Sequence, residues 1–191
     1  MENQYDGHNR VTAQYVEDQG WSHFSYSTQG NVTTLNAPNG VWSKVYYDGA
    51  GRVTAKEDSD GRVEYRYNSL NQLTREKDRL NNITKYEYDS DGNVSKITYP
   101  DGSYQMFEYV GNRQLSILTR QDNSKLWYYY EDGNLVKSKD AKGYELEYEY
   151  DSNNNLIKSI NALKYETTYT SDAATRKPPL SKNLSHYILT E

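Results

Sequence analysis

Residues 47–53 read YDGAGRV, and close copies of this heptapeptide occur at residues 5–11 (YDGHNRV), 88–94 (YDSDGNV) and 150–156 (YDSNNNL). Each copy begins with Tyr and Asp, carries Gly or Asn four positions after the tyrosine, and has an aliphatic residue two positions further on. Gly and Asn accept a positive φ at low energetic cost, so they favour tight turns. The heptapeptide therefore predicts a turn that leads into a β-strand.

The tyrosine of this motif recurs along the chain and reveals a repeat array. Nine tyrosines, called here the anchor tyrosines, follow one another at intervals of 19 to 21 residues. They are Tyr5, Tyr26, Tyr47, Tyr67, Tyr88, Tyr109, Tyr130, Tyr150 and Tyr169. A fixed period of this length is typical of proteins whose repeats stack on one another.

Each repeat contains two turn signals, which divide it into two strands. The first signal follows the anchor tyrosine by four residues, and Gly133 supplies it one residue early. The second comprises Gly20, Gly40, Gly61, Asn81, Asn82, Gly102, Asn123 and Gly143. Between the turns, residues 144–150 alternate Tyr or Leu with Glu, which is the pattern of a strand with one apolar and one charged face. We therefore expect an all-β fold of tandem ~21-residue β-hairpins.

The array is expected to occupy residues 1–170, in about eight units. A single hairpin is marginally stable in water, so neighbouring hairpins must stack into one antiparallel sheet. Residues 171–191 lose the turn signals and contain Pro178 and Pro179, so we expect a degenerate tail or a truncated repeat there. Both ends of the array are expected to be cuts through a longer one, with two unprotected sheet edges.

Composition excludes several classes of protein. The chain has 191 residues, a net charge of -5 and interspersed charges, and it lacks the basic stripe that a nucleic-acid partner requires. It has no apolar run of membrane-spanning length and no signal-peptide pattern. Its zero cysteines exclude disulfides and thiolate sites but leave the compartment open. Its 21 tyrosines supply the bulky, half-apolar surface that the scarce aliphatic residues do not.

The repeated heptapeptide closely resembles the YD repeat of the Rhs family, whose unit is YDxxGRL followed by a second turn that contains Gly. The residues that carry the resemblance include Tyr47, Asp48, Gly51, Tyr88, Asp89, Gly92, Tyr150 and Asp151. The resemblance implies a long sheet that curves and spirals into a hollow β-shell, of which this chain would be an open segment. Such shells enclose a C-terminal effector in bacterial toxin systems and serve adhesion in teneurins.

The resemblance also implies partners and a location. The expected partners are the rest of a longer YD-repeat chain or an enclosed C-terminal effector, in an extracellular or cell-surface setting. Effector-bearing members carry a DPxGL-type core motif, and none occurs here, since Asp172 and Ala173 are not followed by Pro or Gly. Neither the self-cleaving aspartates nor a toxin domain is therefore carried over to this chain.

Residues that could support chemistry are better explained by structure. His8, His23 and His186 lie in different parts of the chain without a partner motif, and no GxSxG elbow is present. The acidic stretch at residues 89–93 resembles a calcium loop, but its Gly comes at position 4 rather than 6 and no Glu closes it. We therefore expect no enzyme activity, no cofactor and no metal site.

One aromatic run keeps a second function open. Trp127, Tyr128 and Tyr129 break the alternation and put aromatic rings on both faces of the predicted strand, so they are candidate ligand contacts. This run resembles choline- or glucan-binding wall repeats, although those repeats carry Trp in nearly every unit. The favoured interpretation is thus a non-catalytic structural and recognition segment of an Rhs-type shell. The alternative is a module that binds cell-wall carbohydrate, with glycans as partners.

Overall fold

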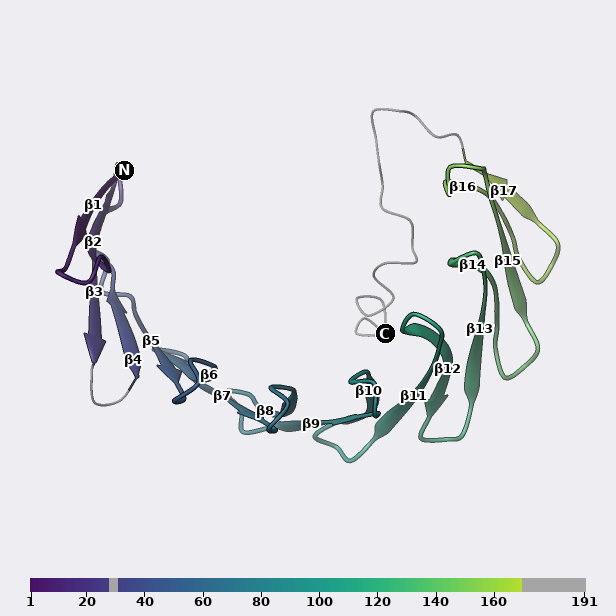
Figure 1. The fold of residues 1–191 in the computed structure, drawn as a ribbon, viewed down its shortest axis with the longest axis horizontal. Coiled ribbons are helices and arrows are strands. Elements are labelled where there is room, and N and C mark those ends of the chain that lie inside the picture. The colour runs from purple at the N-terminus through teal and green to yellow at the C-terminus, as the bar shows by residue number, and fades with distance from the viewer. Residues whose placement is uncertain (28–30, 170–191) are drawn as a thin grey trace. The chain divides into compact units, whose positions relative to one another are not determined.

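The computed structural model describes residues 1–27 and 31–169, and every regular element in these residues is a β-strand (Figure 1). The strands are β1 (Glu2–Tyr5), β2 (Val11–Val16), β3 (Gly20–Ser27), β4 (Val32–Asn36), β5 (Trp42–Tyr47), β6 (Val53–Asp58), β7 (Gly61–Tyr67), β8 (Leu73–Lys77), β9 (Ile83–Tyr88), β10 (Val94–Thr98), β11 (Tyr104–Val110), β12 (Gln114–Arg120), β13 (Lys125–Glu131), β14 (Asn134–Lys139), β15 (Glu145–Tyr150), β16 (Leu156–Ile160) and β17 (Glu166–Thr168). The predicted all-β fold with two strands per repeat is confirmed. The predicted tail at residues 171–191 lies outside the described residues.

The strands fall into two compact units, which we describe separately. The first comprises residues 1–87 and 97–102, and the second comprises residues 88–96 and 103–169 of the described chain. In the first unit, β1 to β9 pair antiparallel in sequence order. In the second, β11 to β17 pair in the same way. Each unit is therefore a simple antiparallel meander of consecutive hairpins.

A β-bulge precedes most of the anchor tyrosines. The register shifts between residues 46 and 47, for example, so that Tyr46 lies opposite Ala55 while Tyr47 lies opposite Val53. The same shift occurs immediately before Tyr5, Tyr67, Tyr109, Tyr130 and Tyr150. A bulge bends the strand and increases its twist. In these six repeats the anchor tyrosine therefore marks the point where the hairpin bends into its first turn.

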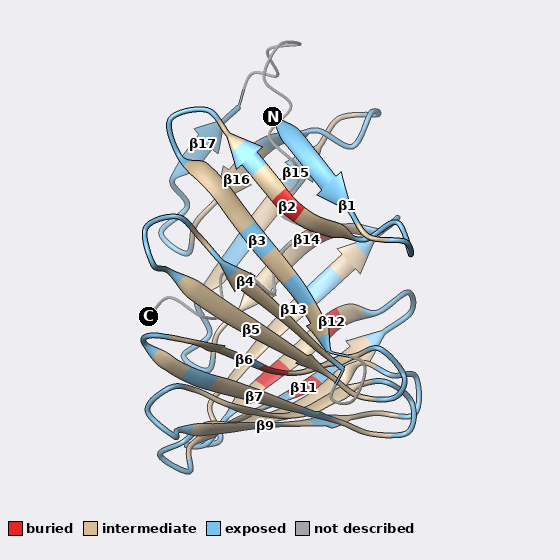
Figure 2. Cartoon of the chain, turned by 90° about the vertical axis from the view of Figure 1, so that its left-hand side faces the viewer, coloured by how far each residue is buried: buried red, intermediate tan, exposed pale blue. Residues whose placement is uncertain are grey.

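Neither unit has a conventional hydrophobic core. Only six apolar side chains in the described residues are buried, namely Ala13, Ala55, Phe107, Leu115, Leu118 and Leu135. Most other strand residues are half-buried, as the tan ribbons of Figure 2 show. Contacts between side chains on neighbouring strands must therefore supply most of the stabilisation. In residues 1–27 and 31–169, no helix is long and apolar enough to cross a membrane.

The strand register assigns residues to the two faces of the second unit. On one face, Phe107 lies opposite Leu118, and Leu118 lies opposite Leu126. On the other, Glu145 lies opposite Lys139, with its carboxylate 3.2 Å from the lysine ammonium. The predicted alternation holds at these positions, but Ile117 and Trp127 lie on the same face as Lys139 and Glu145. Exposed ion pairs of this kind contribute about 0–1 kcal/mol each, so they mainly fix the register.

Candidate functional site

The aspartate after the anchor tyrosine closes the first turn with its own side chain. Asp48 Oδ1 accepts hydrogen bonds from the N–H groups of Ala50 (2.9 Å) and Arg52 (3.0 Å). The Asp48 N–H donates to the carbonyl of Arg52 (2.9 Å), and the Gly51 N–H donates to the carbonyl of Asp48 (3.0 Å). An aspartate that bonds its own backbone in this way stabilises the turn without help from the rest of the protein.

The same four hydrogen bonds recur in both turns of the repeat. They are formed by Asp6, Asn68, Asp89 and Asp151 in first turns and by Asp78, Asp140 and Asn161 in second turns. The residue three positions on always has a positive φ, as predicted for Gly51 (80°) and Gly92 (82°). The prediction that these glycines occupy left-handed backbone is therefore confirmed.

These bonds also perturb the acidity of the turn aspartates. The backbone and side-chain hydrogen bonds from Arg10 lower the pKa of Asp6 to about 2. The pKa of Asp48 is lowered by the equivalent bonds from Arg52, and that of Asp89 chiefly by the side-chain amide of Asn93. The oxygens of Asp89, which the sequence presented as a possible calcium loop, are thus used by the turn itself. No cluster of His, Asp or Glu within residues 1–27 and 31–169 is arranged to hold a metal ion.

The anchor tyrosines join successive repeats through their hydroxyl groups. The hydroxyl of Tyr67 donates to the carbonyl of Val53 at 2.9 Å, and Val53 is the aliphatic residue of the preceding repeat. Equivalent bonds run from Tyr26 to Val11, from Tyr109 to Val94 and from Tyr150 to Leu135. Burial raises the pKa of Tyr109 and of Tyr150, which agrees with a neutral hydroxyl held at the sheet. Each of these four anchors is therefore both a packing group and a hydrogen-bond donor.

A second link between repeats comes from the residue directly before the aliphatic residue of the motif. Arg52 Nη1 donates to the carbonyl of Asn68 (3.0 Å) and to Oδ1 of Asn71 (2.9 Å), both in the next first turn. The shorter side chain of Asn31 reaches the carbonyl of Asp48 (3.2 Å). In the second unit, Gln114 bonds the carbonyl of Gly133 and Asn134 bonds Asn154. We call these bonds the rim contacts, since they connect one first turn to the next.

Arginine at this position also covers the next anchor ring. The Arg10 guanidinium lies 4.4 Å from the ring centroid of Tyr26, and that of Arg52 lies 5.0 Å from the ring centroid of Tyr67. Each guanidinium is also paired with the aspartate of its own turn, at 2.7 Å from Asp6 and from Asp48 respectively. Asn31 holds the equivalent place before Tyr47 and is too short for this role.

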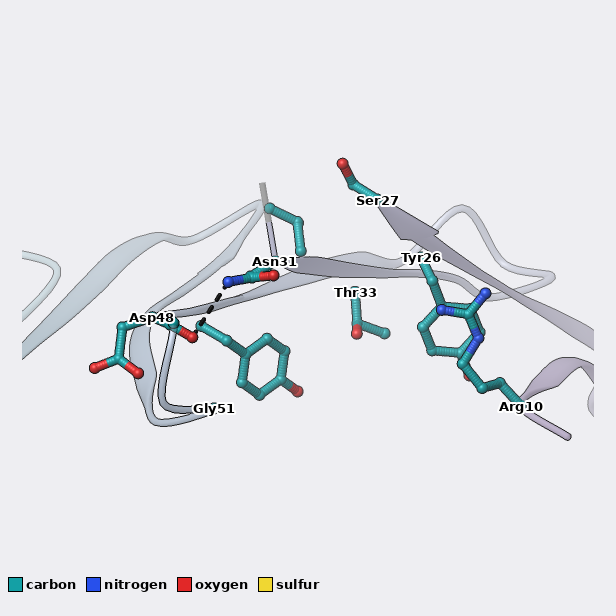
Figure 3. Close-up of a pocket in the computed structure, with 10 residues that line it drawn as sticks. Arg10, Tyr26, Ser27, Asn31, Thr33, Asp48 and Gly51 are labelled. Carbon is teal, nitrogen blue, oxygen red and sulfur yellow. Dashed lines mark hydrogen bonds between the residues drawn. The ribbon is translucent and has the colours of Figure 1, made fainter. Parts of the chain in front are cut away.

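A hollow of about 330 Å³ occurs at this interrupted position (Figure 3). Its lining includes the anchors Tyr26 and Tyr47, together with Arg10, Asn31 and Thr33. Figure 3 shows Thr33 directed to the same side of the sheet as the ring of Tyr26. The volume lies near the lower end of the range for small-molecule sites.

The three aromatic residues proposed as ligand contacts lie on two different faces of the sheet. The register places Trp127 opposite Ile117 and Tyr129 opposite Lys137, on the charged face. Alternation puts Tyr128 on the other face, where burial raises its pKa. Trp127 and Tyr129 can therefore act together, but the three rings cannot form one platform. Tyr129 is 44% exposed, and the Lys137 ammonium lies 5.2 Å from its ring centroid.

Sequence reasoning missed the rim contacts and the hydroxyl acceptors. The residues at the rim-contact position could have been found in the sequence, because the residue directly before the aliphatic residue of the motif is Arg, Asn or Gln in eight repeats. They are Arg10, Asn31, Arg52, Gln72, Asn93, Gln114, Asn134 and Asn155. Sequence reasoning also missed two turn positions with positive φ that are neither Gly nor Asn, Arg113 (63°) and Lys164 (64°). Of the three histidines, His8 and His23 lie in the described residues and His186 lies outside them.

The RHS Repeat family matches residues 47–80, 67–104 and 129–167, which together span 97 of the 191 residues. No curated protein matches the chain in sequence.

Several solved structures are similar in fold. The Photorhabdus luminescens Tc holotoxin pore matches with a TM-score of 0.61 at 15% identity, over 82% of this chain and 11% of that chain. A crystal structure of TcdB2-TccC3 matches with a TM-score of 0.63 at 15% identity, over 80% of this chain and 10% of that chain. The same protein without its hypervariable C-terminal region matches with a TM-score of 0.63 at 13% identity, over 88% and 12%. The chain thus spans about a tenth of the length of these proteins.

Proposed function

Because this chain belongs to the RHS Repeat family, we propose that it is a non-catalytic wall segment of a longer Rhs-type protein. In this proposal the wall is part of a β-shell that encloses a toxic effector or mediates contact at the cell surface. Its role is containment and recognition, and its partners are the other repeats of the same chain and the enclosed effector. The setting we propose is extracellular or at the cell surface.

The observation that carries this proposal is that successive first turns are joined in the same way in both units. Asn31 and Arg52 bond the next turn in the first unit, and Gln114 and Asn134 do so in the second. A sheet stabilised from repeat to repeat needs no second layer to cover it. Such a sheet can be lengthened by adding repeats, which is the property that a container wall requires.

The proposal is tested by protease protection in the longer protein that contains this chain. We expect the sequence downstream of the repeats to resist a broad-specificity protease until the repeats unfold. A Gly51→Val, Gly92→Val variant should weaken two first turns and speed cleavage of that downstream region. The proposal fails if the downstream region is cleaved at the same rate in the intact protein as when it is expressed alone.

Glycan binding is a second candidate function, favoured by one observation. Trp127 and Tyr129 lie two positions apart on the charged face of β13, and Tyr129 is 44% exposed. Exposed aromatic rings on a polar surface are suited to recognition. A glycan array probed with the full chain and with a Trp127→Ala variant tests it. Binding that is lost in the variant supports this function, and binding to no glycan excludes it.

A further inference from the structure

Strand register places three cations in one row across the first unit. Arg66 on β7 lies opposite Arg75 on β8, and Arg75 lies opposite Lys85 on β9. Residues that lie opposite one another in an antiparallel pair project from the same face of the sheet, and neighbouring strands are about 5 Å apart. The three side chains therefore stand side by side on one face, and we call them the basic row. Arg66 and Lys85 are exposed, and Arg75 is half-buried.

The basic row departs from the charge pattern of its surroundings. On the same face, Glu57 lies opposite both Lys44 and Arg62, and Glu64 lies opposite Lys77. The Arg62 guanidinium lies 3.0 Å from the Glu57 carboxylate and 3.3 Å from that of Glu64. Outside the basic row, every pair of charged residues that lie opposite one another between β5 and β9 therefore has opposite signs.

The protein itself supplies no counter-charge to the basic row. Glu64 lies two positions before Arg66 and Glu87 two positions after Lys85, so both carboxylates project from the same face. Within residues 1–27 and 31–169, however, no acidic side chain forms an ion pair with Arg66, Arg75 or Lys85. Like charges directly opposite one another destabilise a sheet. The row therefore lowers the stability of the free chain and leaves three cations available to a ligand.

The chemistry of the row suits a partner that carries several carboxylates in a line. A guanidinium binds a carboxylate through two parallel N–H donors, and lysine adds a compact positive charge. Alternate side chains of an extended peptide are about 6.7 Å apart, compared with about 5 Å between neighbouring strands of the row. The long side chains of arginine and lysine span this difference, because mutual repulsion spreads their charged ends. An extended peptide with acidic residues at alternate positions can therefore place one carboxylate on each cation.

The size of the row argues against larger polyanions. Proteins that bind nucleic acid commonly neutralise about 6–10 phosphates, and clusters that bind anionic membranes contain about 4–8 basic residues. The basic row has only three cations, and the net charge of -5 on the whole chain repels an extended anionic surface. A short acidic segment of a protein needs no more positive charge than the row offers.

We propose that the basic row is a docking site for an extended acidic segment of a partner protein. The segment crosses β7, β8 and β9 and pairs one carboxylate with each of Arg66, Arg75 and Lys85. Its binding offsets the like-charge repulsion within the row, and the affinity falls as salt screens the charges. The site lies apart from the aromatic residues of β13, and it does not depend on the proposed shell.

The test is a titration of the full, isotope-labelled chain followed by nuclear magnetic resonance. The probe is the peptide acetyl-Ser-Glu-Ser-Glu-Ser-Glu-Ser-amide. The same peptide with Gln in place of Glu, a short DNA duplex and phosphatidylserine vesicles are the comparisons. We expect the acidic peptide to shift the side-chain Nε–H signals of Arg66 and Arg75 in a saturable way. The affinity should fall at least ~5-fold between about 20 and about 150 mM sodium chloride. No saturable shift with the acidic peptide, or equal or tighter binding of any comparison, overturns the proposal.

Removal of the central charge separates docking from a structural role. Arg75→Gln eliminates both like-charge contacts of the row, so the variant should melt no lower than the parent at low salt. We expect its affinity for the acidic peptide to fall at least ~5-fold. Arg75→Lys keeps the charge and should retain more affinity than Arg75→Gln. Unchanged affinity in the folded Arg75→Gln variant overturns the proposal.

Two further variants distinguish the basic row from the net charge of the chain. Lys56→Gln is the matched control, since Lys56 is exposed on the opposite face, where it lies opposite Val45 and Val63. It should leave the affinity for the acidic peptide unaltered, and a loss equal to that of Arg75→Gln overturns the proposal. Lys85→Gln changes an exposed position and decides the matter if Arg75→Gln does not fold. We expect it to weaken binding at least ~3-fold, and unchanged affinity in this variant contradicts the proposed contact.

Discussion

At the scale of single residues, the first turn depends on one backbone conformation. Gly51 has a φ of 80°, and a Cβ built there would meet no atom within 4 Å. This position therefore requires a residue that tolerates a positive φ, although there is room for a side chain. Asn71 fills the equivalent place with a φ of 62°, which shows that the turn accepts an Asn.

We predict that Gly51→Val lowers the free energy of unfolding by about 1–2 kcal/mol, because a β-branched residue tolerates left-handed backbone poorly. Gly51→Asn should lose less than half of that amount and serves as the matched control. Urea denaturation followed by tyrosine fluorescence measures both. Equal stability of the two variants would contradict the turn geometry.

The anchor hydroxyl gives a second prediction at this scale. Tyr67→Phe removes only the hydroxyl that donates to the carbonyl of Val53 at 2.9 Å. We expect the free energy of unfolding to fall by about 0.5–1.5 kcal/mol, the usual contribution of one hydrogen bond. Tyr144→Phe, at an exposed second-turn position, is the control and should change stability little. If Tyr67→Phe leaves the free energy of unfolding unchanged, the anchor acts through its ring alone.

At the scale of the hairpin, the rim contacts should couple neighbouring repeats. Arg52 contacts Asp48 in its own turn and Asn68 and Asn71 in the next. We expect Arg52→Met to destabilise the chain more than Lys56→Met, which alters an exposed strand position. A double-mutant cycle with Asn71→Ala should give a coupling energy of about 0.5 kcal/mol or more, since interacting neighbours are not additive. Strict additivity would show that the rim contact does not link the repeats.

The turn aspartates predict a pH dependence at the same scale. Their pKa values are lower in the folded chain than their ordinary value, to about 2 at Asp6 and in the same direction at Asp48, Asp89 and Asp151. Groups with a depressed pKa stabilise the fold fully above their unfolded pKa, and that stabilisation is lost as the pH falls through the folded pKa. The melting temperature should therefore be level from pH 7 to about 5 and fall progressively toward about 2.

Asp48→Asn provides the control for this dependence. The amide keeps the Oδ1 acceptor, as Asn68 shows in its own turn, but it cannot titrate. We expect the variant to lose less stability than the parent between pH 5 and pH 2. A variant curve parallel to that of the parent would exclude Asp48 as a source of the acid sensitivity.

At the scale of the whole molecule, the sequence was sufficient to predict the class of fold. The period of the anchors and the alternation of residues 144–150 depend on local chemistry, and local chemistry determines both strands and turns in this chain. The bulge before Tyr47 and the acceptor of the Tyr67 hydroxyl were not predictable, because they depend on cross-strand register. The hollow beside Tyr47 was not predictable either, because it depends on the Asn31 side chain reaching toward the next repeat.

The central claim is that the chain consists of short hairpins joined in sequence, and that eight of the described turns are each closed by the side chain of their own Asp or Asn. Amide hydrogen exchange resolved by residue tests this claim most directly. We predict protected segments of strand length throughout β2 to β16, separated by fast exchange at the turn tips Gly49, Ser90 and Ser152. The Arg52, Gln72 and Asn155 amides, which donate to a turn Asp or Asn, should be slower than the tips they adjoin. Protection that continues without a break across residues 48–52 and 151–155 would contradict the claim.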